Sequence, residues 1–129
     1  MKPTLLLLFC VLFYSCKKEL TIEDKLSGKW ELRSLVSGWT GRTSTYSPGN
    51  GDIREFTKTT YAEYSNGQLD ESGTYAITKD TTMRGQLADR IIYNGIDRYP
   101  QLFISLEGDR LSFYPNMMDG GGSQYERIK

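Results

Sequence analysis

Residues 26–36, with the sequence LSGKWELRSLV, begin the first of a series of short segments that predict β-strands. From Trp30 onward, mostly apolar residues alternate with mostly polar ones, a period of two that is typical of a strand with one buried face. Gly28 allows a sharp backbone turn into this strand. Trp30 then supplies an apolar side chain large enough to plug the end of a barrel.

Seven further segments have the same strand-like composition and are separated by turn residues. Asn66-Gly67 is the strongest short turn signal in the chain, and Gly108-Asp109 predicts a second tight turn. We expect a long loop at 37–51, shorter loops at 66–72, 94–100 and 115–122, and no helix after Gly28. The strands are expected near 30–36, 52–57, 60–65, 73–78, 87–93, 102–107, 111–114 and 123–128.

Eight short strands in about a hundred residues predict a single all-β domain over residues 28–129. Most connections are short enough for hairpins, so neighbouring strands are expected to pair up and down around the sheet. Eight antiparallel strands can close into a β-barrel with room for side chains or for one small ligand. The predicted fold is therefore an eight-stranded, up-and-down antiparallel barrel.

The charge and residue composition exclude several classes of function. The chain has 129 residues, with 16 Lys and Arg against 16 Asp and Glu, so the basic excess expected of a nucleic-acid-binding protein is absent. It contains no histidine, the commonest general base and metal ligand. We therefore predict no catalytic residues, no metal site, no cofactor and no nucleic acid partner.

The first fifteen residues predict a signal peptide. An apolar run of ten residues, Leu5 to Tyr14, is too short to span a bilayer, which takes about 20 residues. Cys10 is removed with this leader, which leaves Cys16 alone and excludes an internal disulfide. Residues 16–27 then form a charged tether, within which Thr21 can cap one helical turn with Asp24 three residues on.

The segment Phe13-Tyr14-Ser15-Cys16 resembles the lipobox of bacterial lipoproteins, in the looser form found in Bacteroidetes. The resemblance implies that Cys16 carries lipid and becomes the mature N-terminus. The chain would then be anchored by acyl chains such as palmitate to the outer membrane of the bacterial cell envelope, on its periplasmic face or at the cell surface. The alternative is an ordinary secreted protein with a free thiol at Cys16.

Within the mature chain, residues 26–129 resemble the short lipocalin-like domains of bacterial lipoproteins. Gly28-Lys29-Trp30 is similar to the Gly-x-Trp signature of lipocalins, and Tyr125-Glu126-Arg127 is similar to their last strand. The resemblance implies a lipocalin-like (calycin) barrel in which Arg127 stacks on Trp30, so that Gly28, Trp30 and Arg127 form a structural plug. The alternative makes Trp30 ordinary core and Arg127 a solvated edge residue. The disulfide and C-terminal helix of many animal lipocalins are missing, so their ligands are not transferred.

Two sets of residues are candidates for function, one inside the predicted barrel and one in its loops. The expected barrel interior consists of Leu32, Tyr61, Tyr75, Ile77, Ile91, Tyr93, Leu102, Ile104 and Phe113. Apolar residues in the loops at the unplugged end are Trp39, Tyr46, Ile96, Tyr99, Met117 and Met118.

We interpret these loop residues as the rim of a site for a small, partly hydrophobic ligand. One alternative is an accessory or inhibitor-type barrel that binds an envelope protein through its rim and has a filled interior. Another is that the loop residues cover the barrel's own core and bind nothing.

Overall fold

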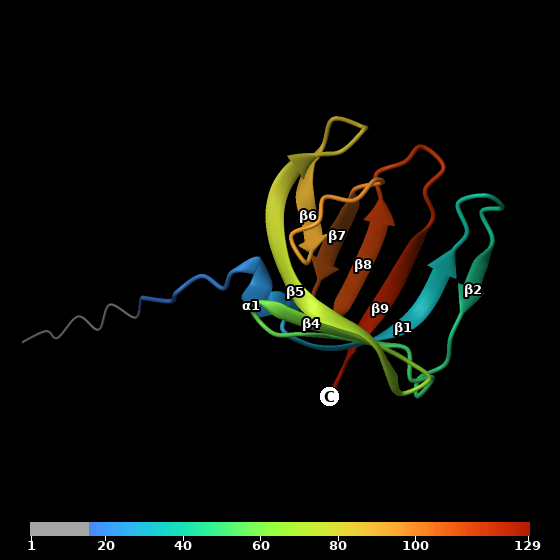
Figure 1. The fold of residues 1–129 in the computed structure, drawn as a ribbon, viewed down its shortest axis with the longest axis horizontal. Coiled ribbons are helices and arrows are strands. Elements are labelled where there is room, and N and C mark those ends of the chain that lie inside the picture. Colours follow the sequence, from blue (N-terminus) through green and yellow to red (C-terminus); the bar gives the residue numbers. More distant parts are fainter. Residues whose placement is uncertain (1–15) are drawn as a thin grey trace, which may run out of the picture.

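The computed structural model describes residues 16–129, and the expected signal peptide at 1–15 lies outside them. Within the described residues, one short helix, α1 (Ile22–Leu26), precedes nine antiparallel strands (Figure 1). These are β1 (Gly28–Val36), β2 (Thr43–Thr45), β3 (Ile53–Phe56), β4 (Thr60–Ser65), β5 (Gln68–Thr81), β6 (Leu87–Tyr93), β7 (Leu102–Glu107), β8 (Arg110–Pro115) and β9 (Gly122–Ile128).

Eight of these strands form a closed barrel. The order around the sheet is β1-β3-β4-β5-β6-β7-β8-β9, and β9 pairs back onto β1. Trp30 on β1 lies opposite Arg54 on β3 and opposite Arg127 on β9. The predicted eight-stranded antiparallel barrel, with neighbours in chain order, is therefore confirmed.

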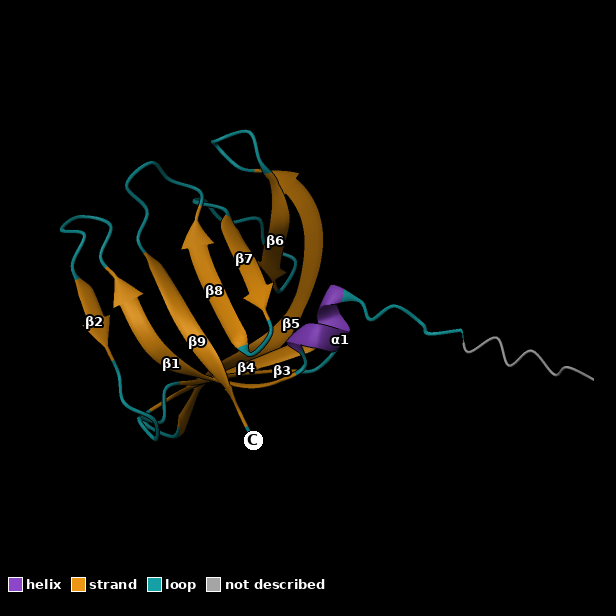
Figure 2. Cartoon of the chain, turned by 180° about the vertical axis from the view of Figure 1, so that it is seen from behind, coloured by secondary structure: helices purple, strands orange, loops and turns teal. Residues whose placement is uncertain are grey.

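Two loops differ from the prediction. The expected loop at 37–51 contains β2, a short extra strand that pairs with the far end of β1 (Figure 2). The expected loop at 66–72 is wrong, because Asn66 and Gly67 alone make the turn, at φ values of 50° and 78°. A two-residue turn of this kind continues directly into both strands. β5 therefore begins at Gln68, in a polar stretch whose composition gave no strand signal.

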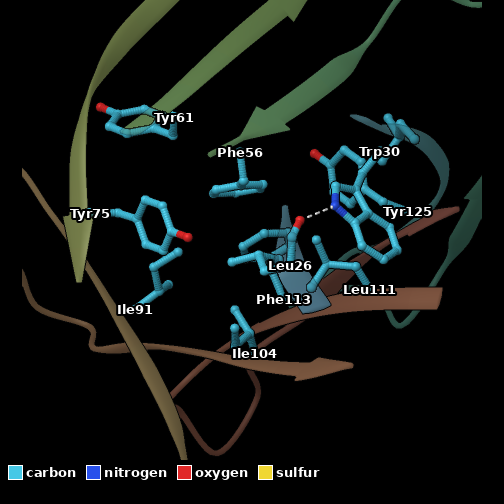
Figure 3. Packing of buried hydrophobic residues seen from close by; sticks show 11 residues of the cluster. Leu26, Trp30, Phe56, Tyr61, Tyr75, Ile91, Ile104, Leu111, Phe113 and Tyr125 are labelled. Atoms are coloured by element: carbon cyan, nitrogen blue, oxygen red, sulfur yellow. Dashed lines mark hydrogen bonds between the residues drawn. The ribbon is translucent and has the colours of Figure 1, made fainter. Parts of the chain in front are cut away.

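The helix α1 closes one end of the barrel. Thr21 and Asp24 form the capping box expected from the sequence. The side chain of Leu26 is fully buried, and its carbonyl accepts a 2.7 Å hydrogen bond from the indole nitrogen of Trp30 (Figure 3). Residues 22–27 consequently belong to the barrel rather than to the tether, which was predicted too long.

The contact expected between Arg127 and Trp30 is present at this closed end. The guanidinium carbon of Arg127 lies 4.2 Å from the centre of the Trp30 ring. Its two terminal nitrogens donate to the carbonyls of Ser27 at 2.8 Å and Lys25 at 2.6 Å. Gly28 has a φ of +131°, and a Cβ there would lie 2.7 Å from Arg127. Arg127 thus packs over the Trp30 ring at the plugged end and is not a solvated edge residue.

The predicted interior residues face the inside of the barrel. Leu32, Tyr61, Tyr75, Ile91, Ile104 and Phe113 are buried in one core cluster, and Ile77, Tyr93 and Leu102 are partly buried against it. The rings of Phe56 and Tyr75 meet edge to face, with their centres 5.2 Å apart (Figure 3). Around the plug the barrel is therefore filled largely by aromatic side chains.

Candidate functional site

A group of polar side chains shares the barrel interior with this aromatic core. Residues directly opposite each other in an antiparallel sheet point to the same face. Trp30 points inward and lies opposite Arg54, which lies opposite Glu63, which in turn lies opposite Glu71. The register therefore brings one arginine and two carboxylates from β3, β4 and β5 to the inner face.

These three residues were not predicted from the sequence, because charged side chains in the strands were expected to face solvent. A signal was present nevertheless. Arg54 is two residues from the buried Phe56, and Glu63 is two residues from the buried Tyr61. With a period of two, each charged residue must share the face of its buried neighbour.

Arg54 is held in place by one ion pair and two aromatic rings. Its Nε forms an ion pair with a Glu63 carboxylate oxygen at 3.3 Å. Its guanidinium carbon lies 4.3 Å from the centre of the Phe113 ring and 5.1 Å from that of Tyr125. Its Nη1 nitrogen is buried and has no hydrogen-bond partner within the described residues. A guanidinium N–H can only donate, so this atom requires an acceptor.

Two tyrosines lie beside this cluster with different surroundings. The hydroxyl of Tyr61 donates to Glu71 at 2.7 Å and accepts from the Asn94 amide at 3.1 Å. The ring of Tyr93 lies 4.5 Å from that of Tyr61, but its hydroxyl is buried without a partner in the described part of the chain. Burial raises the pKa of the Tyr93 hydroxyl, so it remains a neutral donor at physiological pH.

A pocket of about 280 Å³ opens at this place. Its volume lies just below the range of about 300–1,000 Å³ that is common for ligand sites. From the barrel interior it is lined by Tyr61, Glu63, Glu71, Ile91, Tyr93 and Leu102, and from the loop after β6 by Ile96, Arg98, Pro100 and Gln101. We call this the mouth pocket. It combines apolar walls with polar and charged groups from both the strands and the loop, among them Arg90 of β6.

The structure does not gather the predicted rim residues around the mouth pocket. Trp39 is 99% exposed and Tyr99 is 85% exposed, and neither lines it. Met117 and Met118 line a different groove, between the β8–β9 loop and the β5–β6 hairpin that carries Met83. The expectation of a single rim is therefore wrong, because these loops lie over different parts of the barrel.

Tyr46 also differs from its predicted place. Its side chain is half-buried and packs against the core cluster, so it is not an exposed rim residue. The loop that follows it is fixed by Glu31, a buried carboxylate on the outer face of β1. Glu31 accepts hydrogen bonds from the backbone of Gly49 and from Arg33, both at 2.8 Å. This contact orders the loop between β2 and β3 and has no part in the mouth pocket.

No family model, curated protein or solved structure matches this chain. In residues 16–129 there is no group of three or more side chains suited to hold a metal ion. No helix in the same part of the chain is long and apolar enough to cross a membrane. The geometry thus defines a class, a closed β-barrel with a plugged end and a small, partly polar pocket.

Proposed function

We propose that this protein is a lipid-anchored, lipocalin-like binding protein of the bacterial envelope, and that its mouth pocket takes a small, partly hydrophobic ligand. The observation that carries the proposal is the mouth pocket itself, on whose wall the buried hydroxyl of Tyr93 has no partner in the described residues. Buried polar groups in proteins almost always have partners. An unpaired hydroxyl on the wall of this pocket offers a hydrogen bond to a ligand.

The walls of the pocket support the hydrophobic part of the ligand. Ile91 and Leu102 lie opposite each other on β6 and β7 and both line the pocket. Small-molecule sites typically combine such apolar walls with a few placed polar groups. A ligand with an apolar body and one polar end matches this distribution.

The ligand itself can be sought by native mass spectrometry of the protein purified from its own host. We expect a co-purifying small molecule that is lost when Leu102→Phe narrows the pocket. Leu106→Phe is the matched control, because Leu106 is also partly buried on β7 but does not line the mouth pocket. Equal retention by both variants, or no ligand in the unaltered protein, contradicts the proposal.

The lipid anchor is tested separately. Cys16 is exposed, and a short segment without regular structure separates it from α1. Metabolic labelling with a palmitate analogue should mark the unaltered protein and not Cys16→Ala. Stable anchoring takes two or more acyl chains, since one chain binds membranes only marginally. Equal labelling of both proteins would show that Cys16 is not the lipidated residue.

A second candidate function is the binding of an envelope protein through the loops. Trp39, Tyr99 and Met118 favour it, because large apolar side chains with this exposure are common contact residues in interfaces. A pull-down from envelope extract should lose its partner with Trp39→Ser and retain it with Leu69→Ser, an exposed residue on β5. Loss of Trp39 should change the free energy of unfolding by less than about 0.5 kcal/mol. A partner that binds both variants equally contradicts this candidate.

A further inference from the structure

We propose that the groove between the β5–β6 hairpin and the β8–β9 loop binds a soft monovalent metal ion, Cu(I), through the thioethers of Met83, Met117 and Met118. The groove has a volume of about 310 Å³, and all three side chains line it. We call it the methionine groove. It shares only Pro115 with the mouth pocket, so metal binding here does not depend on a ligand there.

The methionines of this chain are concentrated at one place. The sequence contains four of them, and apart from Met1, which lies outside the described residues, every one lines this groove. Methionine is among the residues that are most often buried. Here Met83, Met117 and Met118 are 57%, 48% and 73% exposed, and none of them belongs to the core cluster. Packing of the barrel therefore does not account for their position.

A hydrogen bond holds the two loops of the groove together. The backbone nitrogen of Met83 donates to Oδ1 of Asn116 at 2.7 Å, and Met117 and Met118 directly follow Asn116 in the chain. The backbone then folds back, because the nitrogen of Gly120 donates to the carbonyl of Met117 at 3.4 Å. Each methionine side chain has three rotatable bonds. Rotation of the side chains can therefore bring the three sulfur atoms toward one ion.

The chemistry of these ligands selects the ion. Thioether sulfur is soft and uncharged, and it suits Cu(I). Zn(II) is bound by thiolate, imidazole and carboxylate groups, and no such side chain of the described residues lines the groove. The absence of a metal cluster in residues 16–129 concerns His, Cys, Asp and Glu side chains, and thioethers are not among them.

The charge of the groove also favours a monovalent ion. Arg84 is the one charged side chain of the described residues that lines it. Because Arg84 is exposed, water screens its repulsion of a bound cation. The groove has no lining carboxylate in the described part of the chain to balance a second positive charge, so a divalent ion fits it less well.

The test adds Cu(I), under anaerobic and reducing conditions, to the full chain with Cys10→Ala and Cys16→Ala, which contains no thiol. Competition with a chromogenic Cu(I) chelator should give one bound ion per chain, with a dissociation constant of about 1 μM or lower. Met83→Leu, Met117→Leu and Met118→Leu keep the apolar volume and remove the sulfur, and each should weaken binding at least about tenfold. Leu87→Ile, exposed on β6 and outside the groove, is the matched control. No binding, or unchanged affinity in any of the three methionine variants, overturns the proposal.

NMR of the methionine methyl groups locates the ion without any substitution in the groove. The methyl resonances of Met83, Met117 and Met118 should shift together up to one equivalent of Cu(I), while that of Met1 stays constant as an internal reference. Zn(II) added in the same way should shift none of them. A response of only one or two of the three groove methionines, or an equal response to Zn(II), overturns the three-sulfur site.

Discussion

Two arginines of this barrel, Arg127 and Arg54, lie over aromatic rings on the strands to either side of Trp30, and their surroundings differ. Arg127 covers Trp30 at 4.2 Å and uses its terminal nitrogens on the carbonyls of Ser27 and Lys25. Arg54 covers Phe113 at a similar distance of 4.3 Å but retains a buried nitrogen without a partner among the described residues. Both terminal nitrogens of Arg127 thus have partners, whereas one terminal nitrogen of Arg54 has none in the described residues. The contact with an aromatic ring is thus the same in both, and the hydrogen-bond partners make the difference.

The largest effect expected from this difference lies at the plug. Trp30→Ala removes a fully buried indole together with its hydrogen bond to Leu26, and should lower the free energy of unfolding by about 3–5 kcal/mol. Chemical denaturation measures this loss. A cost below about 1 kcal/mol would show that the plug does not hold the barrel closed.

Removal of the covering arginine should cost less. Arg127→Ala loses a cation–π contact of about 0.5–2 kcal/mol and leaves the carbonyls of Lys25 and Ser27 to water, for a total of about 2 kcal/mol. A double-mutant cycle with Trp30→Ala should show coupling, because the two side chains are in contact. Strict additivity would contradict the stacked arrangement.

Two tyrosines, Tyr75 and Tyr93, are expected to respond differently in free energy of unfolding when the hydroxyl is removed. The hydroxyl of Tyr75 donates to the carbonyl of Thr57 at 2.7 Å, so Tyr75→Phe should lower the free energy of unfolding by about 1 kcal/mol. The hydroxyl of Tyr93 is buried and unpaired, so Tyr93→Phe should leave stability unchanged or raise it by about 1 kcal/mol in the ligand-free protein. Equal destabilisation by both substitutions would contradict the difference in pairing between the Tyr75 and Tyr93 hydroxyls.

The smallest expected effect is a local response to acid at the Glu31 contact. Burial acts to raise the pKa of the Glu31 carboxyl, but the N–H donors of Gly49 and Arg33 hold it below its ordinary value of 4.5. A carboxyl with a lowered pKa stabilises the fold above its ordinary pKa, and this contribution is lost as the pH falls through the folded-state value.

The amide resonance of Gly49 should therefore shift with acid below about pH 4.5, while the fluorescence of Trp30 stays constant over the same range. In Glu31→Gln the shift should disappear. A change at Trp30 first would show that acid opens the plugged end before it releases this loop.

Several features of the fold were readable from the sequence because they depend on local chemistry. Alternating residues predicted β1, the Asn66-Gly67 pair predicted a tight hairpin, and Thr21 with Asp24 predicted the helix cap. The mouth pocket was not predicted, since Glu63 and Glu71, two of its lining residues, look like solvent-facing residues until their strands are paired. The rim was predicted wrongly, because loop residues have no periodicity to place them.

The sequence by itself determined an eight-stranded antiparallel barrel, its aromatic interior and the plug of Trp30 by Arg127. Each of these follows from residue pattern, from turn geometry or from family resemblance. The tertiary structure alone decided which polar groups meet inside the barrel and which of them find partners. The physical reason is that pairing register, and not residue type, sets which side chains face one another across a sheet. Whether a buried donor finds a partner depends on atoms from strands far apart in the chain, and among the described residues Arg54 Nη1 and the Tyr93 hydroxyl find none.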